Sequence, residues 1–322
     1  MEIATYAEGV KILIVGAGAV GQVYGWHLAK AGHEVAALGR PSQAGAAQEG
    51  FVLSSLQDAK DRELGRWVPA AFYTGGREVD DSWDQVWLCV GTHALDESWL
   101  KPLASRTPSA SVVSLQPGTA VRERLSQFWP RQAIIRGVIG MISAGRNGNL
   151  GAAFYFPPGV KSQFSAVPKD KARSVVKALR AGGVPAQVVE DADLALAWGS
   201  GFLMPNIVTL ESVEWSISRL ASWSVAALAA RAAREAHSLV ARRYGRRRPL
   251  WSYLIRAPLL MVGWRVGRWV MRFDLEAYLK MHFLKVRPQT REMVASYLRD
   301  ADKHAISSPA LRRLQHDVFE TS

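Results

Sequence analysis

The chain has 322 residues, of which 48% are hydrophobic and 21% charged; this excludes a disordered chain and leaves room for two folded domains. Cys89 is the only cysteine, which excludes a disulfide framework and a cysteine-ligated metal site, and we expect no metal. The formal net charge of +12 points to anionic partners. The first residues lack the basic-then-apolar order of a signal peptide, so we expect a cytoplasmic protein.

The first regular element predicted is a strand over residues 10–15, which runs directly into a glycine-rich turn. A helical pattern over 20–31 follows, and a second apolar run comes at 34–38. Strand, glycine turn, helix and strand in this order form the first βαβ unit of a dinucleotide-binding fold. We therefore predict a Rossmann-type domain in the N-terminal half.

The glycine turn has the spacing Gly-x-Gly-x-x-Gly. Gly16 permits the tight turn, Gly18 lets backbone N–H groups approach a pyrophosphate, and Gly21 lets the helix pack close to the strand. The positive end of the helix dipole adds to the attraction for phosphate. The cofactor-binding residues predicted in this turn are Gly16, Ala17, Gly18, Ala19, Val20 and Gly21.

The end of the second strand indicates which dinucleotide binds. NAD sites usually place Asp or Glu there, which accepts hydrogen bonds from the ribose hydroxyls. This chain has Gly39 and Arg40 instead, and a guanidinium attracts the 2′-phosphate that a carboxylate would repel. We predict NADP(H) as the cofactor; the alternative is that Arg40 is a solvated surface side chain.

Further strands follow in the N-terminal half, together with one helix at 169–181. The predicted strands are 51–53, 67–70, 86–90, 111–115, 133–135, 138–141, 164–167 and 186–189. Ligands of an open parallel sheet bind outside the carboxyl ends of the strands. The loops after 86–90 and 111–115 should therefore lie near the cofactor, and their predicted cofactor-binding residues are Gly91, Thr92, His93, Gln116 and Gly118.

From residue 191 the pattern is helical almost to the end of the chain. The predicted helices are 202–230, 232–243 and 289–304. Pro258 is expected to break or kink the apolar segment between the last two. The predicted fold class is α/β: a Rossmann-type dinucleotide-binding domain of residues 1–190 followed by an all-α domain of residues 191–322.

The sequence resembles the ketopantoate reductase family. The glycine turn together with Arg40 is similar to that family's NADP site, and Leu-Gln-Pro-Gly at 115–118 is similar to its Leu-Gln-Asn-Gly. Residues 195–198 and 304–309 are similar to the start of its helical domain and to the turn closing its last helix. The resemblance implies an NADP(H)-dependent oxidoreductase that transfers a hydride to a small carbonyl substrate, such as a 2-oxo acid, or to an imine.

The family's catalytic residues do not carry over to this chain. The family's lysine after the fourth strand corresponds to Gly91, and its catalytic lysine falls on Ser200 or Phe202. No lysine occurs between residues 178 and 279, and the family's substrate-binding glutamate corresponds to Gln289. We therefore expect a substrate other than ketopantoate. The alternative function is a non-catalytic sensor or regulatory protein that binds NADP(H).

Three polar residues of the helical half are candidates for catalysis. Glu211 is the only acid on an apolar helix face, where it acts either as a general acid with a raised pKa or as the partner of Arg219 or another arginine. Asn206 either orients a substrate carbonyl or caps a helix. His282 lies between apolar residues and is either catalytic or structural.

Residues 242–272 contain nine arginines, three tryptophans and no acid. No stretch of the length needed for a spanning helix is free of charge. One interpretation is that this segment is an ordinary part of the helical domain, with its tryptophans in the core and its arginines in solvent. We expect this, because a cofactor-dependent enzyme of this kind needs a complete helical domain to close its cleft. The alternative is peripheral membrane contact through 242–272.

The expected partner of the protein is a small, anionic substrate. Binding to nucleic acid is not expected, because no recognised binding module accompanies the positive charge. The oligomeric state stays open, with a homodimer among the alternatives.

Overall fold

The computed structural model describes residues 9–58, 62–95, 97–118 and 121–320. The chain divides into two compact units, an N-terminal unit (Met1–Ala195) and a helical unit (Leu196–Ser322). The sequence predicts the boundary between the domains at residue 190, whereas the compact units divide after Ala195. The two units are described separately below.

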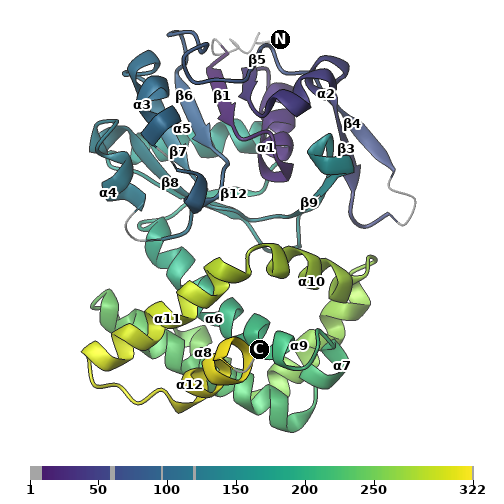
Figure 1. The fold of residues 1–322 in the computed structure, drawn as a ribbon, viewed down its shortest axis with the longest axis vertical. Helices are drawn as coiled ribbons and strands as arrows, with labels where there is room; N and C mark the ends of the chain where they lie inside the picture. Colours follow the sequence, from purple (N-terminus) through teal and green to yellow (C-terminus); the bar gives the residue numbers. More distant parts are fainter. Residues whose placement is uncertain (1–8, 59–61, 96, 119–120, 321–322) are drawn as a thin grey trace, which may run out of the picture. The chain divides into compact units, whose positions relative to one another are not determined.

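The larger sheet of the N-terminal unit has eight strands in the order β12-β11-β8-β7-β6-β1-β2-β5. All neighbouring strands are parallel except β8 and β11, which are antiparallel. This is a Rossmann-type sheet, as predicted, extended by two strands at one edge (Figure 1). The bounds are β1 Lys11–Val15, β2 Glu34–Leu38, β5 Phe72–Tyr73, β6 Gln85–Leu88, β7 Ser111–Ser114, β8 Ile134–Val138, β11 Ser162–Ser165 and β12 Ala186–Val188.

A second sheet of four strands, in the order β4-β3-β10-β9, was not predicted from the sequence. Its strands are β3 Phe51–Ser55, β4 Glu63–Trp67, β9 Ile142–Arg146 and β10 Gly151–Tyr155. The predicted strand 67–70 begins where β4 ends, and the predicted strand 138–141 ends just before β9 begins. Both predictions are therefore wrong by about one strand length. Gly and Ser residues interrupt the run of apolar side chains in β9 and β10, and for this reason the sequence did not predict these strands.

The helices of the N-terminal unit are α1 Ala19–Lys30, α2 Ala44–Glu49, α3 Glu97–Arg106, α4 Val121–Leu125 and α5 Lys169–Ala181. Helix α1 packs against both sheets and against α5. Its side chains Val23, Tyr24 and Leu28 have no exposed surface. The helix that starts at the glycine turn is therefore also the central element of the unit's core.

The helical unit contains six helices besides α6, which begins in the N-terminal unit. The bounds are α6 Ala192–Ser212, α7 Ile217–Leu220, α8 Trp223–Arg243, α9 Ala257–Val270, α10 Leu275–Lys285, α11 Arg287–Lys303 and α12 Pro309–Gln315. Helix α8 is the central one, since it packs against α9, α11 and α12. In the ranges that the structure covers, no helix is both long and apolar enough to cross a bilayer.

The predicted single helix over 202–230 is wrong. Helix α6 starts earlier, at Ala192, and the chain breaks after Ser212, where Glu214 and Trp215 adopt positive φ angles of 58° and 64°. Neither glycine nor proline marks this break, and tertiary packing imposes it: Trp215 is 7% exposed and belongs to the core of the helical unit.

The segment 242–272 folds as part of the helical unit. The apolar segment is broken next to Pro258, as expected: a 3-10 helix ends at Leu254, and α9 begins at Ala257 with Pro258 in its first turn. Proline is tolerated there because that N–H would have no partner within the helix. The expectation that the tryptophans lie in the core is wrong for two of the three. Trp251 is 46% and Trp269 86% exposed, whereas Trp264 is half-buried.

Candidate dinucleotide-binding site

The glycine turn between β1 and α1 has the tight geometry that its spacing predicts. Gly16 has a φ of +98°, and its N–H donates to the carbonyl of Leu38 at 2.8 Å. A Cβ on Gly21 would lie 2.1 Å from the carbonyl oxygen of Gly16. Both glycines are thus required by the packing of the turn itself.

Gly18 differs from these two, because neither the conformation nor the packing of the chain requires a glycine there. Its φ and ψ of −82° and −174° are open to any residue, and an added Cβ would meet no atom within 4 Å. Gly18 is the N-cap of α1; no side chain caps the helix, and the first turn carries no acid. The free space and the uncapped N–H groups fit a phosphate of a bound dinucleotide.

Two buried glutamines hold this turn in place, and the sequence analysis missed both. The side-chain amides of Gln22 and Gln43 both donate to the carbonyl of Ala17, at 2.9 and 2.6 Å. Both also donate to the carbonyl of Asn149, at 2.7 and 3.1 Å. Gln43 lies only five residues beyond the end of the second strand, and a buried side-chain amide at that place needs hydrogen-bond partners.

Gln43 also fixes the backbone at the end of β2. Its Oε1 accepts a hydrogen bond of 3.1 Å from the backbone N–H of Arg40. The N–H of Gly39 donates to the carbonyl of Tyr73 at 3.0 Å. The Arg40 side chain is exposed, so one glutamine links the glycine turn to the residue predicted to select the cofactor.

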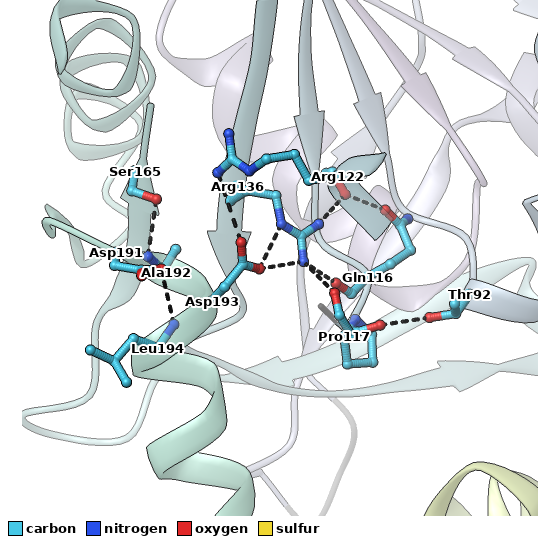
Figure 2. A network of polar contacts seen from close by, with 12 residues as sticks. Thr92, Gln116, Pro117, Arg122, Arg136, Ser165, Asp191, Ala192, Asp193 and Leu194 are labelled. Atoms are coloured by element: carbon cyan, nitrogen blue, oxygen red, sulfur yellow. Dashed lines mark hydrogen bonds and ion pairs between the residues drawn. The ribbon is translucent and has the colours of Figure 1, made fainter. Parts of the chain in front are cut away.

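The loops after β6 and β7 are tied to each other at the carboxyl edge of the sheet. Thr92 donates through Oγ1 to the carbonyl of Pro117 at 3.1 Å (Figure 2). Gln116 is 1% exposed, and its Nε2 donates to the carbonyls of Leu88 and Val90 at 2.8 and 2.9 Å. Its Oε1 accepts from Ser114 as well. Gln116 thus connects the ends of two strands.

The other residues predicted to bind the cofactor in these loops are Gly91, His93 and Gly118. Gly91 precedes a short 3-10 turn at Thr92–Ala94, and Gly118 has a φ of +117°. The side chain of His93 lies outside the described residues. The structure therefore brings the glycine turn and both loops to the carboxyl ends of β1, β6 and β7, as predicted for a parallel sheet.

A buried arginine, Arg136 on β8, holds together the polar groups beside these loops (Figure 2). It is 1% exposed, and its Nη1 donates to Ser114 Oγ at 2.5 Å. Nη2 donates to the carbonyls of Gln116 and Gly118, at 2.8 and 3.4 Å. The sequence carried a signal for this site: an arginine in the middle of an apolar strand must find partners inside the protein.

The acid that neutralises Arg136 is Asp193, in the first turn of α6. Nε and Nη2 of Arg136 lie 2.8 and 2.7 Å from the same Oδ1, and Arg122 approaches Oδ2 at 3.8 Å. The backbone N–H of Ala192 donates to Ser165 Oγ at 3.0 Å. The start of α6 is therefore fastened to the sheet directly beside the loop of Gln116.

Two ionisable side chains of the N-terminal unit are Tyr24, which belongs to the core, and the partly buried Cys89, which packs against that core. Burial raises the pKa of the Cys89 thiol and, as the largest of several causes, that of the Tyr24 hydroxyl. Both groups are therefore neutral at pH 7. Neither provides a nucleophile or a base beside the turn, which agrees with Cys89 acting as a small hydrophobic residue.

Of the two interpretations of Glu211, the structure shows an ion pair. Its Oε1 lies 2.6 Å from Nε of Arg287, and its side chain is 13% exposed. The partner is not Arg219, which pairs with Glu214 instead. Arg287 also donates to the carbonyl of Val318 at 2.8 Å. A role of Glu211 as general acid stays a prediction.

The structure corrects one of the two expectations for Asn206. It lies within α6 rather than at a helix end, so it caps nothing. It has no exposed surface; its Nδ2 donates to the carbonyl of Phe202 at 2.8 Å, and its Oδ1 accepts from Trp264 at 3.3 Å. Oδ1 and one of the two N–H groups of Nδ2 are thus engaged inside the helical unit. The alternative role of Asn206, to orient a substrate carbonyl, stays a prediction.

His282 on α10 is stacked on Tyr278, with ring centroids 5.8 Å apart. Its side chain is exposed. Within the described ranges, no hydrogen bond or ion pair joins any two of Glu211, Asn206 and His282. The structure therefore does not assemble the three predicted catalytic residues into one polar cluster.

The parallel sheet, the glycine turn and the two adjoining loops define a dinucleotide-binding protein of the Rossmann class. Residues 12–155 match the family model of the ketopantoate reductase PanE/ApbA. Over these residues the N-terminal unit is similar to the ketopantoate reductases, a family of NAD(P)-dependent oxidoreductases.

Solved structures with the same fold cover nearly the whole chain. A D-mandelate dehydrogenase with NADH and anilino(oxo)acetate has 15% identity and a TM-score of 0.74, covering 97% of both chains. A 2-dehydropantoate 2-reductase from Geobacter metallireducens GS-15 has 17% identity and a TM-score of 0.74, covering 97% of this chain and 100% of its own.

A PanE/ApbA family ketopantoate reductase from Ralstonia eutropha JMP134 has 21% identity and a TM-score of 0.73, covering 96% of this chain and 97% of its own. At these identities the likeness shows the fold. No curated protein sequence gives a significant match.

Proposed function

We propose that this protein is an NADP(H)-dependent reductase or dehydrogenase that transfers a hydride between the cofactor and a small carbonyl compound. The observation that carries the proposal is the arrangement around Gly18: open space at an uncapped helix N-terminus, with Arg40 rather than a carboxylate at the end of β2. The family match of residues 12–155 supports the reaction class.

The proposed roles of the chain's own residues follow from their positions. Backbone N–H groups of the turn 16–21 and the start of α1 bind the pyrophosphate. The Arg40 guanidinium, held by the fixed backbone beside Gln43, binds the 2′-phosphate through charge-assisted hydrogen bonds. When bound, the cofactor supplies or accepts the hydride at its nicotinamide ring.

We propose a 2-oxo acid as the substrate class, with an imine as the alternative. The bound ligand named for the D-mandelate dehydrogenase structure, anilino(oxo)acetate, likewise carries an oxo group next to a carboxylate. The net charge of +12 favours the approach of an anionic substrate. The absence of lysine from residues 178–279 argues against ketopantoate, since the family's catalytic lysine has no counterpart.

The cofactor preference is tested by titrating NADPH and NADH into the wild-type protein, Arg40→Ala and the control Arg173→Ala. Arg173 is also exposed, but it lies on α5, away from the glycine turn. Arg40→Ala should weaken NADPH binding roughly 10- to 150-fold and leave NADH nearly unchanged. Equal losses for both cofactors would remove the basis for NADP(H).

The reaction is tested by following the oxidation of NADPH with a panel of 2-oxo acids and imines. Turnover on any of them supports the reductase. Tight NADPH binding without turnover across the whole panel would favour the alternative, a sensor of the cofactor.

A further inference from the structure

Helix α9 has an apolar stripe on the side that faces away from the core of the helical unit. The core side is formed by Ala257, Leu260 and the half-buried Trp264. On the opposite side the exposed apolar residues follow at intervals of three, four, three and one. They are Leu259 (51% exposed), Val262 (56%), Val266 (50%), Trp269 (86%) and Val270 (41%).

The segment that leads into α9 and the start of α8 carry further exposed apolar side chains. Leu250, Tyr253 and Leu254 are 88%, 52% and 62% exposed, and Trp223 at the start of α8 is 64% exposed. Scattered exposed apolar residues are normal on a protein surface, but a group of this size and regularity marks an interaction site.

A cavity of about 370 Å³ lies between the start of α8 and the first turn of α9, where the exposed Trp223 and Tyr253 and the α9 residue Pro258 form part of its wall. Three arginines, Arg231, Arg234 and Arg256, line the same cavity, and no acid does. Within the described ranges, neither Arg231 nor Arg256 forms an ion pair with a carboxylate.

An adjacent hollow of about 200 Å³ also contains Arg231 and Arg234, together with Arg248 and one acid, Glu235. Both carboxylate oxygens of Glu235 accept hydrogen bonds from the first backbone N–H groups of α12, at 3.1 and 2.9 Å. The acid is thus engaged as a helix cap, and the larger cavity keeps its uncompensated positive charge.

We propose that the exposed face of α9, with the segment 250–254 and the arginine-lined cavity, binds the surface of an anionic membrane. The apolar stripe enters the boundary between headgroups and acyl chains, where tryptophan is favoured. The arginines of the cavity bind a lipid phosphate, and those of 242–272 add long-range attraction.

The charge argues against a second copy of this chain as the occupant. A two-fold symmetric contact would place each stripe and its arginines against the same surface of the other copy. Between residues 242 and 272 nine arginines are met by no acid, so that contact would be repulsive. An anionic bilayer matches both the apolar stripe and the positive charge around it.

The test is co-sedimentation of the full-length protein with vesicles of phosphatidylcholine alone, or of phosphatidylcholine with phosphatidylserine, at low and at physiological salt. Two double variants separate the two parts of the surface. Arg231→Gln with Arg256→Gln removes charge from the cavity, and Leu259→Ser with Val266→Ser removes part of the stripe. All four positions are exposed, so both variants should fold.

Each double variant has a matched control in the N-terminal unit. Arg124→Gln with Arg173→Gln makes the same change in net charge at exposed helix positions. Val68→Ser with Val160→Ser removes two aliphatic side chains that are 59% and 45% exposed. Light scattering on every variant measures the oligomeric state.

The wild type and both controls should bind the anionic vesicles, more strongly at low salt, and should bind phosphatidylcholine weakly. The cavity variant should lose roughly 30-fold in partitioning, and the stripe variant about tenfold or more. Absence of vesicle binding, or equal losses in the controls, would overturn the proposal.

Two other results would also overturn it. Loss of binding in the cavity variant alone would indicate adsorption by charge without insertion. Conversion of a dimer to a monomer by the stripe variant, with unchanged vesicle binding, would assign the surface to self-association.

Discussion

Arg136 and Asp193 meet across 57 residues of chain, with Nε 2.8 Å and Nη2 2.7 Å from the same carboxylate oxygen. Arg136 is 1% exposed and also binds the loop that follows β7. One side chain therefore fixes two things at once: the cofactor loop at the carboxyl edge of the sheet, and the first turn of the helix that continues into the helical unit.

Replacing this arginine should be costly. Arg136→Met leaves the mostly buried carboxylate of Asp193 with only Arg122, at 3.8 Å, and removes donors from Ser114 Oγ and two loop carbonyls. We expect the free energy of unfolding to fall by about 3–5 kcal/mol. Urea unfolding followed by circular dichroism measures this loss.

The matched control is Arg131→Met, because Arg131 forms an exposed pair with Glu123 at 3.8 Å in the same unit. Its removal should change stability by less than about 1 kcal/mol. Arg136→Met with Asp193→Leu should cost less than the sum of the two single changes, since it leaves no unpaired charge. Similar values for Arg136→Met and the control would refute this account.

A second prediction concerns Gln43, which holds the glycine turn and the backbone of Arg40. Gln43→Glu would turn a carboxylate toward the carbonyls of Ala17 and Asn149, which now accept hydrogen bonds from the amide at 2.6 and 3.1 Å. We expect a loss of stability of about 1–3 kcal/mol. The Kd for NADPH should rise at least tenfold, because the turn and Arg40 both move.

Gln48→Glu is the control for this change, because Gln48 is exposed on the neighbouring helix α2 and gains the same charge. Its NADPH titration should match that of the wild type. If both variants bind NADPH equally well, Gln43 does not position the site.

The glycine turn could be predicted because the residues that form it are close together in the sequence. The strand, the glycine turn and the helix occupy residues 10–31, and the conformation of Gly16 and the packing of Gly21 against it involve only this stretch. The placement of Thr92 and Gln116 followed from one rule, that parallel strands end at the same edge of the sheet. No distance between side chains was needed for either inference.

The partners of buried polar groups could not be predicted. Arg136 finds Asp193 on an element that follows four later strands, and Glu211 finds Arg287 rather than the near neighbour Arg219. Such pairs depend on how distant elements pack. The exposed stripe of α9 was missed for a similar reason: its apolar residues cover both sides of the helix, so their pattern does not show which side is buried.

The third prediction distinguishes the two interpretations of Glu211. As a structural partner of Arg287, it should tolerate Glu211→Gln with a stability loss of about 1–3 kcal/mol and a change in kcat of less than about threefold. As a general acid it should lose roughly 10²–10⁴-fold in kcat. Steady-state kinetics on a substrate found in the panel, together with thermal unfolding, measures both quantities.

Arg287→Met is the companion variant, since it breaks the same 2.6 Å pair from the other side. If the pair is structural, the two variants should have similar effects on stability, and the double variant should lose less than their sum. A large kcat loss in Glu211→Gln but not in Arg287→Met would instead support the general acid.

The last prediction concerns acid stability and rests on two buried histidines, one in each unit. His27 is 6% exposed and bonds through Nδ1 to the carbonyl of Gly182 at 2.7 Å; His237 has no exposed surface and bonds to the carbonyl of Ala233 at 2.7 Å. Burial lowers the pKa of both below the ordinary value of 6.5. Nearby cations, Lys30 and Arg248, act in the same direction.

The direction in which stability changes with pH follows from which state of the chain, folded or unfolded, binds the proton. Above pH 6.5 both histidines are neutral in the folded and the unfolded chain, so they add no pH dependence. As the pH falls below that value, the unfolded chain takes up protons that the folded chain does not, and stability decreases. Each histidine contributes a slope of up to about 1.4 kcal/mol per pH unit.

Urea unfolding at a series of pH values through this range measures the slope for the wild type, His27→Gln and His237→Gln. Each variant should be less stable at neutral pH, because it loses a buried hydrogen bond and ring contacts, yet its stability should fall less steeply in acid. His316→Gln is the control, since His316 is exposed, and it should keep the wild-type slope. Variants with unchanged slopes would show that other groups cause the acid sensitivity.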